Sequence, residues 1–226
     1  MTIAYFQTLN VAAEFGPEIR QNFREHAVPV LLECPEIDCV SVYAPELAED
    51  PYVDDGPPPE LVVQFNVADL EALELVFNDQ SVVPILVAPE NATASAEVFE
   101  VIAYDIEGVA EPEKRTAPLS FNVRYYAPVT DEQHFVDFYL AHHPQILAEL
   151  PGIRNVFCYV PVVSSAKSPA PISNCILGNE VVFDTLDALN QSMKTEVRHR
   201  LREDYNAFPV RPGPNTHFAM QRQDFS

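Results

Sequence analysis

Two stretches of the chain align without a gap: FREHAVPVLLECPEIDCVSVYAPE at 23–46 and YLAHHPQILAELPGIRNVFCYVPV at 139–162. The constant offset of 116 residues (142 minus 26) superposes His26 on His142, Pro35 on Pro151, Tyr43 on Tyr159 and Pro45 on Pro161. The same offset places LEAL at 70–73 on LDAL at 186–189. A register shared over about fifty residues indicates a duplicated unit, and one repeat of this length excludes a solenoid.

Each half of the chain predicts the same order of elements. For the first half these are a strand at 3–9, a helix at 16–33, strands at 38–44 and 60–67, a helix at 69–80 and a strand at 96–105. For the second half they are a strand at 120–126, a helix at 131–150, strands at 154–160 and 179–185, a helix at 186–206 and a strand at 216–225. The order is β-α-β-β-α-β, which is typical of an α+β ferredoxin-like unit.

Local signals mark the ends of these elements. Thr130, with Gln133 three residues later, forms a capping box that predicts the start of the long helix in the second half. Pro35 and Pro151 end the first helix of each half, because proline cannot continue a helix. A ferredoxin-like sheet has one bare face, which the two copies can cover for each other. We therefore predict two related domains, 1–110 and 118–226, joined by the charged, proline-containing segment 106–119.

The composition bounds the classes of function. The 226 residues are 47% hydrophobic and 21% charged, with a formal net charge of −21, which disfavours nucleic acid and anionic membrane surfaces as partners. No apolar run is long enough for a transmembrane helix. The N-terminal MTIAYFQTLNVAAEFGPEIR has no basic segment before an apolar core, so we expect a cytoplasmic protein without a signal peptide.

The charge is uneven along the chain. Residues 1–115 carry 4 Lys and Arg against 23 Asp and Glu (net −19), whereas residues 116–226 carry 9 against 11 (net −2). The excess of acidic residues indicates either a solvated surface or a difference in role between the two halves. The run EVRHRLRED at 196–204 is explained by a solvated helix face with local ion pairs.

The usual motifs of metal and nucleotide sites are missing from the sequence. Its four cysteines form no CxxC pair and no Cys/His cluster with zinc-ligand spacing. There is no glycine-rich phosphate loop, GxSxG, HExxH or Walker pattern. We therefore expect neither a metal nor a cofactor, and buried free thiols in a reducing compartment.

The segment FVDFYLAHHPQILAELPGIRNV (135–156) is similar to the EthD family of the dimeric α/β-barrel superfamily. The family pattern has an aromatic residue, then His-x-Pro, then Leu-Pro-Gly before the second strand. The residues that fit it here are Tyr139, His142, Pro144, Leu150, Pro151 and Gly152. The likeness covers most of 118–226. The first half resembles a divergent copy, because it keeps His26 and Pro35 but has Pro29 one place late and Glu36 instead of the glycine.

The resemblance implies that two sheets close a barrel around a cavity, here as a pseudo-dimer within one chain, either as a monomer or as a homodimer of that barrel. It also implies an enzyme acting on a small hydrophobic carbonyl or phenolic compound, as an isomerase, a cyclase or a cofactor-free monooxygenase. A non-catalytic module that binds a small molecule or assembles with a partner is the alternative. Haem binding through an axial histidine belongs to other branches of the superfamily, and no feature here selects it.

The long helix of the second half supplies the acid–base candidates. His142 and His143 flank an apolar arc on opposite sides, so both are expected near the boundary of helix and sheet. Each imidazole either hydrogen-bonds a nearby carbonyl or acts near neutral pH as an acid or base. We prefer His142 as the catalytic residue because His26 occupies the same place in the first half. Tyr139, three residues before His142, is expected to contact it.

The first strand of the second half supplies the binding candidates. Its alternation directs Phe121, Val123 and Tyr125 to the helices and Asn122, Arg124 and Tyr126 to the barrel interior. A buried Arg124 must either pair with an acidic residue such as Glu180 or hold an anionic or carbonyl group. Tyr159, the repeat partner of Tyr43, is a core residue or a further binding residue. We therefore expect Arg124, Tyr126, Tyr139, His143, Tyr159 and His26 to line the site around His142.

Overall fold

The computed structural model describes residues 2–211 and 213–226. The first unit consists of β1 (Ile3–Asn10), η1 (Ala13–Phe15), α1 (Gly16–Asn22), η2 (Phe23–Ala27), α2 (Val28–Leu32), β2 (Val40–Glu46), β3 (Leu61–Val67), α3 (Leu70–Asn78), α4 (Val83–Leu86) and β4 (Thr93–Ala103). The second consists of β5 (Leu119–Tyr126), α5 (Glu132–Leu147), β6 (Ile153–Pro161), β7 (Cys175–Phe183), α6 (Leu186–Ser192), α7 (Glu196–Asn206) and β8 (Asn215–Phe225). Both units therefore have the predicted β-α-β-β-α-β order.

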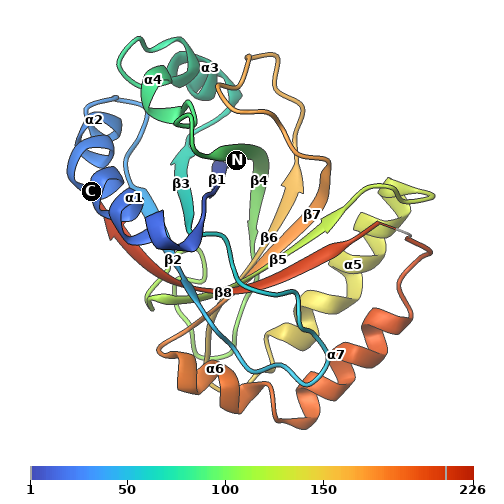
Figure 1. The fold of residues 1–226 in the computed structure, drawn as a ribbon. Coiled ribbons are helices and arrows are strands. Elements are labelled where there is room, and N and C mark those ends of the chain that lie inside the picture. Colours follow the sequence, from blue (N-terminus) through green and yellow to red (C-terminus); the bar gives the residue numbers. More distant parts are fainter. Residues whose placement is uncertain (1, 212) are drawn as a thin grey trace.

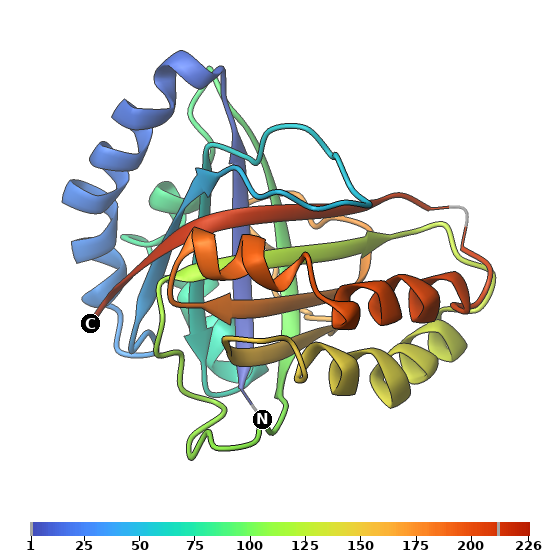
Figure 2. The same ribbon diagram turned by 90° about the horizontal axis from the view of Figure 1, so that it is seen from below.

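The eight strands form one closed antiparallel barrel in the order β1-β3-β2-β8-β5-β7-β6-β4. The two units meet at two seams, where β2 pairs with β8 and β4 pairs with β6. In each seam the last strand of one unit pairs with the second strand of the other, and both are edge strands of their own unit's sheet. The chain therefore closes the barrel on itself, and the predicted pseudo-dimeric fold is confirmed. The helices of each unit lie outside the barrel against that unit's own sheet (Figures 1 and 2).

Strand alternation divides the apolar side chains into three clusters. One cluster lies between the first-unit sheet and its helices, and a second lies in the corresponding layer of the second unit. The third fills the barrel lumen, where Phe6, Tyr43, Phe99 and Tyr159 are all fully buried. Each strand thus presents one face to its helices and the other to the lumen, so the fold offers two kinds of place for a site.

Two details of the helices differ from the sequence prediction. The N-cap of α5 is Asp131, whose carboxylate accepts the amide of His134, rather than Thr130, one residue earlier. The helix predicted at 186–206 is divided into α6 and α7, with Thr185 capping the first part. The division lets α7 turn back along α5, so that both helices cover the second-unit sheet.

The long loops between the second and third strands of each unit reach over to the other unit. We call residues 47–60 the first strap and residues 162–174 the second strap. The first strap lies against α7, where Asp50 forms a bidentate ion pair with Arg198 at 2.8 and 2.9 Å. In the second strap, the carbonyl of Pro171 accepts the amide of Ala96 on β4 at 2.8 Å. Each strap therefore covers the partner unit rather than its own.

Among the described residues, none of the helices is long and apolar enough to cross a membrane. The segment between β4 and β5 enters one end of the lumen through Arg115 and Ala117. The division of the chain into domains at 1–110 and 118–226 remains a prediction.

Candidate functional site

Strand β5 separates two cavities, because its alternate side chains lie on opposite faces of the sheet. Phe121, Val123 and Tyr125 line a cavity between the second-unit sheet and helices α5 and α7, which we call the helix–sheet cavity. The intervening Asn122, Arg124 and Tyr126 line a cavity at the open end of the barrel, which we call the lumen cavity. The predicted orientations are therefore confirmed, but the histidines of α5 and the polar residues of β5 do not meet in one site.

The helix–sheet cavity has a volume of about 60 Å³ and contains a histidine–carboxylate pair at its wall. His143 on α5 is buried, and its Nδ1 lies 2.7 Å from a carboxylate oxygen of Asp204 on α7. In this arrangement the Nδ1 proton is donated to the carboxylate, which leaves Nε2 as the basic atom. No hydrogen bond engages Nε2 within residues 2–211 and 213–226.

The surroundings of His143 favour the neutral imidazole. Burial lowers the pKa of His143 below its ordinary value of 6.5, although the hydrogen bond and the charge of Asp204 oppose this shift. The rings of Tyr139 and Phe208 lie 4.9 and 5.2 Å from the imidazole and exclude water from it. At neutral pH the side chain is therefore an unprotonated base that is oriented by a carboxylate.

Asn179 on β7 supplies a second polar group to the helix–sheet cavity. Its Nδ2 donates to the hydroxyl of Tyr139 at 2.5 Å. Its Oδ1 is buried and accepts no hydrogen bond from the described part of the chain. Burial raises the pKa of Tyr139 far above its ordinary value, so this phenol stays neutral. The cavity thus holds a base and an unpaired acceptor, and Tyr139 reaches the cavity only through Asn179.

The first strap closes the helix–sheet cavity from the outside. Asp50 and Val53 of the strap are among the residues that line it, together with Arg198 and Arg202 of α7. Besides the Asp50–Arg198 pair, Asp55 lies 2.8 Å from Nδ1 of His217 on β8. The hydrogen bond from His217 lowers the pKa of Asp55, which favours the charged carboxylate at this contact.

His142 lies outside both cavities. Side chains at i and i+4 share a helix face, so Phe135, Tyr139 and His143 form one buried stripe of α5, and His142 is rotated by about 100° toward solvent. Its Nδ1 lies 2.7 Å from the carbonyl of Phe138, and its ring stacks on Phe138. The expected placement of both histidines at the sheet boundary, with Tyr139 against His142, is therefore corrected: Tyr139 packs against His143. Catalysis by His142 remains a prediction.

His26 repeats the environment of His142 in the first unit. It is exposed, and its Nδ1 lies 3.2 Å from the carbonyl of Asn22, four residues earlier. Subtracting 116 from 142 and 138 gives 26 and 22, so the two contacts are equivalent in the repeat. The repeated histidine thus makes a repeated local contact on the helix surface.

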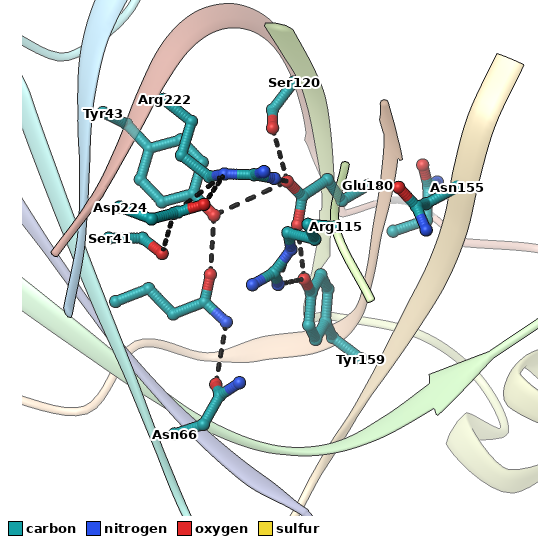
Figure 3. A network of polar contacts seen from close by, with 12 residues as sticks. Ser41, Tyr43, Asn66, Arg115, Ser120, Asn155, Tyr159, Glu180, Arg222 and Asp224 are labelled. Atoms are coloured by element: carbon teal, nitrogen blue, oxygen red, sulfur yellow. Dashed lines mark hydrogen bonds and ion pairs between the residues drawn. The ribbon is translucent and has the colours of Figure 1, made fainter. Parts of the chain in front are cut away.

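Tyr159 and Glu180 belong to a polar network at the other end of the lumen (Figure 3). Glu180 is fully buried and accepts hydrogen bonds from the hydroxyls of Ser120 and Tyr159, each at 2.5 Å, and from Arg115 at 3.2 Å. Burial alone would raise the pKa of Glu180, but Arg115 and Arg222 hold it below its usual value. The hydroxyl of Tyr159 is engaged by Glu180 and Arg115, so Tyr159 is a core residue of the lumen.

Arg124 is paired with Glu97 on β4 at 2.8 Å, rather than with Glu180. The register of β5 and β7 places Glu180 beside Asn122, one layer nearer the closed end, where Arg115 and Arg222 neutralise it. Sequence reasoning missed Glu97 and Asp204, because each partner comes from a distant element. Asp204 lies in the 196–204 run assigned to a solvated face, whereas it contacts buried His143.

No group of three or more His, Cys, Asp and Glu side chains suited to a metal ion occurs within the described part of the chain.

Comparisons with known proteins give the fold. The chain is similar to the crystal structure of an anthrone oxidase-like protein, with 14% identity, coverage of 100% of this chain and 92% of that chain, and a TM-score of 0.62. It is also similar to a candidate monooxygenase from Lactobacillus acidophilus, with 12% identity, coverage of 98% and 93%, and a TM-score of 0.56. The chain therefore has the dimeric α/β-barrel fold.

An EthD family protein from Bacillus halodurans is also among the similar structures. It shows 21% identity and covers 48% of this chain and 97% of that chain, with a TM-score of 0.35. No family model matches the chain, and no curated protein matches it.

Proposed function

We propose that the protein is an enzyme that transfers a proton within a small, largely apolar carbonyl or phenolic compound, with His143 as the base. The observation that carries the proposal is the buried His143–Asp204 pair on the helix–sheet cavity. A neutral imidazole oriented by a carboxylate is the usual device for taking a proton near neutral pH. The structural comparisons support the fold alone, so the proposal rests on this geometry.

The residues around His143 suit the abstraction of a proton from carbon next to a carbonyl, or from a phenol. Nε2 of His143 takes the proton. When the proton leaves carbon, the electron pair of the C–H bond moves to the carbonyl oxygen and gives an enolate; when it leaves a phenol, the pair of the O–H bond stays on oxygen and gives a phenolate. Arg202 lines the same cavity, with its guanidinium over the rings of Tyr52 and Tyr205, and no ion pair among the described residues uses it, so its charge can stabilise that anion. Oδ1 of Asn179 accepts a hydrogen bond from a substrate hydroxyl. Isomerisation, cyclisation and oxygenation of an activated aromatic compound can each begin with this step.

The helix–sheet cavity is too small for a substrate while the first strap covers it. A volume of about 60 Å³ corresponds to roughly two water molecules, which is less than any phenolic substrate needs. The strap is held by the side-chain contacts of Asp50 and Asp55 with α7 and β8. Substrate entry therefore requires the strap to lift, as active-site loops do in many enzymes.

The test is deuterium incorporation in D₂O, followed by proton NMR, over a panel of hydroxyaryl ketones, phenols and lactones. This readout detects abstraction of a carbon-bound proton whatever the later steps are, whereas a phenolic O–H exchanges with D₂O without a catalyst and does not report on the site. We expect at least one compound to exchange at a rate that falls by about 10²- to 10⁴-fold in His143→Gln. The glutamine amide still donates to Asp204, so the variant retains the buried contact but loses the base.

His142→Ala is the matched control, because its imidazole is adjacent in sequence and exposed. We expect full exchange in this variant. Loss of exchange in His142→Ala with retention in His143→Gln would overturn the proposal in favour of His142. The second candidate, a non-catalytic binding module, is favoured by the closed strap over a very small cavity. It predicts that ligands bind while no compound on the panel exchanges.

A further inference from the structure

The lumen cavity is large enough for a ligand and is built by both units. Its volume is about 440 Å³, within the range of about 300–1,000 Å³ that is usual for small-molecule sites. Its walls come from β1 and β4 of the first unit and from β5 and β8 of the second, and Pro57–Pro59 of the first strap form one edge. The cavity therefore exists only because the chain closes its own barrel.

The cavity has a fixed polar group at its floor. The guanidinium of Arg124 donates from Nε to Glu97 at 2.8 Å and from Nη1 to the carbonyl of Val123 at 3.0 Å. It also lies against the rings of Phe6 and Tyr159, at 4.7 and 5.1 Å from their centroids. These contacts hold the group rigid, and none of the hydrogen bonds within the described residues uses Nη2. One donor is thus left for a ligand.

An unpaired acceptor lies two residues away on the same face of β5. Oδ1 of Asn122 is buried and has no hydrogen-bond partner in the described part of the chain. Asn122 and Arg124 both line the cavity. Leaving a buried amide oxygen without a partner is unfavourable, so a ligand hydroxyl at this position would be favoured.

The charges around the cavity cancel. Glu97 neutralises Arg124 at the floor, and Arg20 pairs with Glu60 at the rim at 2.5 Å. A ligand carboxylate beside Glu97 would meet a neutral pair rather than a free cation. The remaining walls are largely apolar and aromatic, and include Phe218, Val62 and Met220.

We propose that the lumen cavity is a second ligand site, distinct from the helix–sheet cavity, for an uncharged aromatic compound that carries both a carbonyl and a hydroxyl group. The ligand's carbonyl oxygen accepts a hydrogen bond from Nη2 of Arg124, and its hydroxyl donates a hydrogen bond to Oδ1 of Asn122. The site lies on the opposite face of β5 from His143, so it goes beyond the proton-transfer site and does not depend on it.

The methionines provide the means of locating a ligand without changing the cavity. The sequence has three, Met1, Met193 and Met220. Met220 lines the lumen cavity, and Met193 lines the helix–sheet cavity. With ¹³C-methyl-labelled methionine, each cavity therefore has its own NMR signal. The probe is 4-hydroxyacetophenone, and the matched probes are 4-hydroxybenzoate, which is charged, and acetophenone, which lacks the hydroxyl.

We expect 4-hydroxyacetophenone to shift the Met220 signal in a saturable titration and to bind at least tenfold more tightly than either matched probe. Asn122→Leu is expected to remove the advantage over acetophenone, because it deletes the acceptor. His143→Gln is expected to leave the titration unchanged. Since the readout is binding at Met220, failure here leaves the exchange test of the proton-transfer site untouched.

Three outcomes would overturn the inference. The first is a shift of Met193 alone, which would place the ligand in the helix–sheet cavity. The second is tighter binding of 4-hydroxybenzoate, which would show that Arg124 acts as a free cation. The third is no saturable shift of Met220 with any probe at millimolar concentration.

Discussion

Two positions distinguish the helix–sheet layers of the two units, because the first unit has apolar side chains where the second places polar side chains on the helix–sheet cavity. Ala27 and Val63 occupy the positions that His143 and Asn179 occupy 116 residues later. Ala27 is buried and Val63 lies in the first-unit core, where the rings of Tyr5 and Phe65 stack at 4.9 Å. One fold with one register therefore carries a packed core in one copy and a candidate catalytic pair in the other.

The charges of the two units differ for a related reason. The first unit holds most of the acidic excess, and part of it is used on the second unit. Asp50 and Glu49 of the first strap pair with Arg198 and Lys194, at 2.8 and 3.0 Å. The acidic half thus supplies the cover of the helix–sheet cavity, and the less acidic half supplies the cations that hold it. These ion pairs favour the second interpretation of the charge pattern, in which the two halves differ in role.

The largest expected effect is on the free energy of unfolding, when Glu180 in the second unit is replaced by the glutamine that the first unit has at the equivalent position. Gln64 and Glu180 are equivalent in the repeat, and each accepts a tyrosine hydroxyl, from Tyr43 at 2.6 Å and from Tyr159 at 2.5 Å. Glu180→Gln leaves the buried charge of Arg115 without its carboxylate. We expect the free energy of unfolding to fall by about 3–5 kcal/mol, measured by urea denaturation.

Gln64→Leu is the matched control for this comparison. It removes the hydrogen-bond acceptor of Tyr43 but leaves no buried charge unpaired, so we expect the free energy of unfolding to fall by less, about 1–3 kcal/mol. Equal losses in the two variants would mean that the ionic part of the network contributes nothing. Glu180 and Gln64 would then stabilise their units equally, each through one hydrogen bond to a tyrosine.

An intermediate effect is expected in the pH dependence of stability. Burial lowers the pKa of His143 in the folded protein, so below its ordinary value of 6.5 the unfolded chain binds more protons at this site. The free energy of unfolding must therefore decline as the pH falls from about 6.5 toward the lower folded pKa. Asp55, whose folded pKa lies below 3.8, contributes stability that is lost only at more acidic pH.

Urea denaturation of the wild type and His143→Gln between pH 5 and pH 8 measures this contribution. We expect the variant to lose the part of the slope that lies below pH 6.5, because it has no proton to bind at this position. His142→Ala should retain it. A slope that is the same in all three proteins would show that His143 is as solvated in the folded state as in the unfolded chain.

The sequence predicts the fold from signals that are local or periodic. The shared offset indicates two copies, and the alternation in β5 assigns Asn122 and Arg124 to the lumen and Val123 to the helices. These inferences succeed because the period of a strand is fixed by its backbone. The element order also predicts that the bare sheet faces of the two units cover each other, whereas the closed barrel is what the resemblance to the EthD family implies.

The candidate site is less predictable because it depends on contacts between elements. The rotation of α5 about its axis is set by packing of Phe135 and Tyr139 on the sheet, and this decides that His143 rather than His142 is buried. Asp204 lies 61 residues after His143, and Glu97 belongs to the other unit. A single sequence carries no signal for such pairs, since they depend on the tertiary packing of helices and strands.

The smallest effects are expected where the two copies agree. His26 and His142 are both exposed, and each has Nδ1 near the carbonyl four residues earlier. We expect His26→Ala and His142→Ala each to change the free energy of unfolding by less than about 0.5 kcal/mol, as measured by urea denaturation. His26 and His142 would then be equivalent surface residues, and the two units would differ at the next position, which is Ala27 in the first unit and His143 in the second. If His142→Ala alone lowered stability, a ligand or a second copy of the chain would have to cover α5, and the histidine present at this position in both units would have a role in only one.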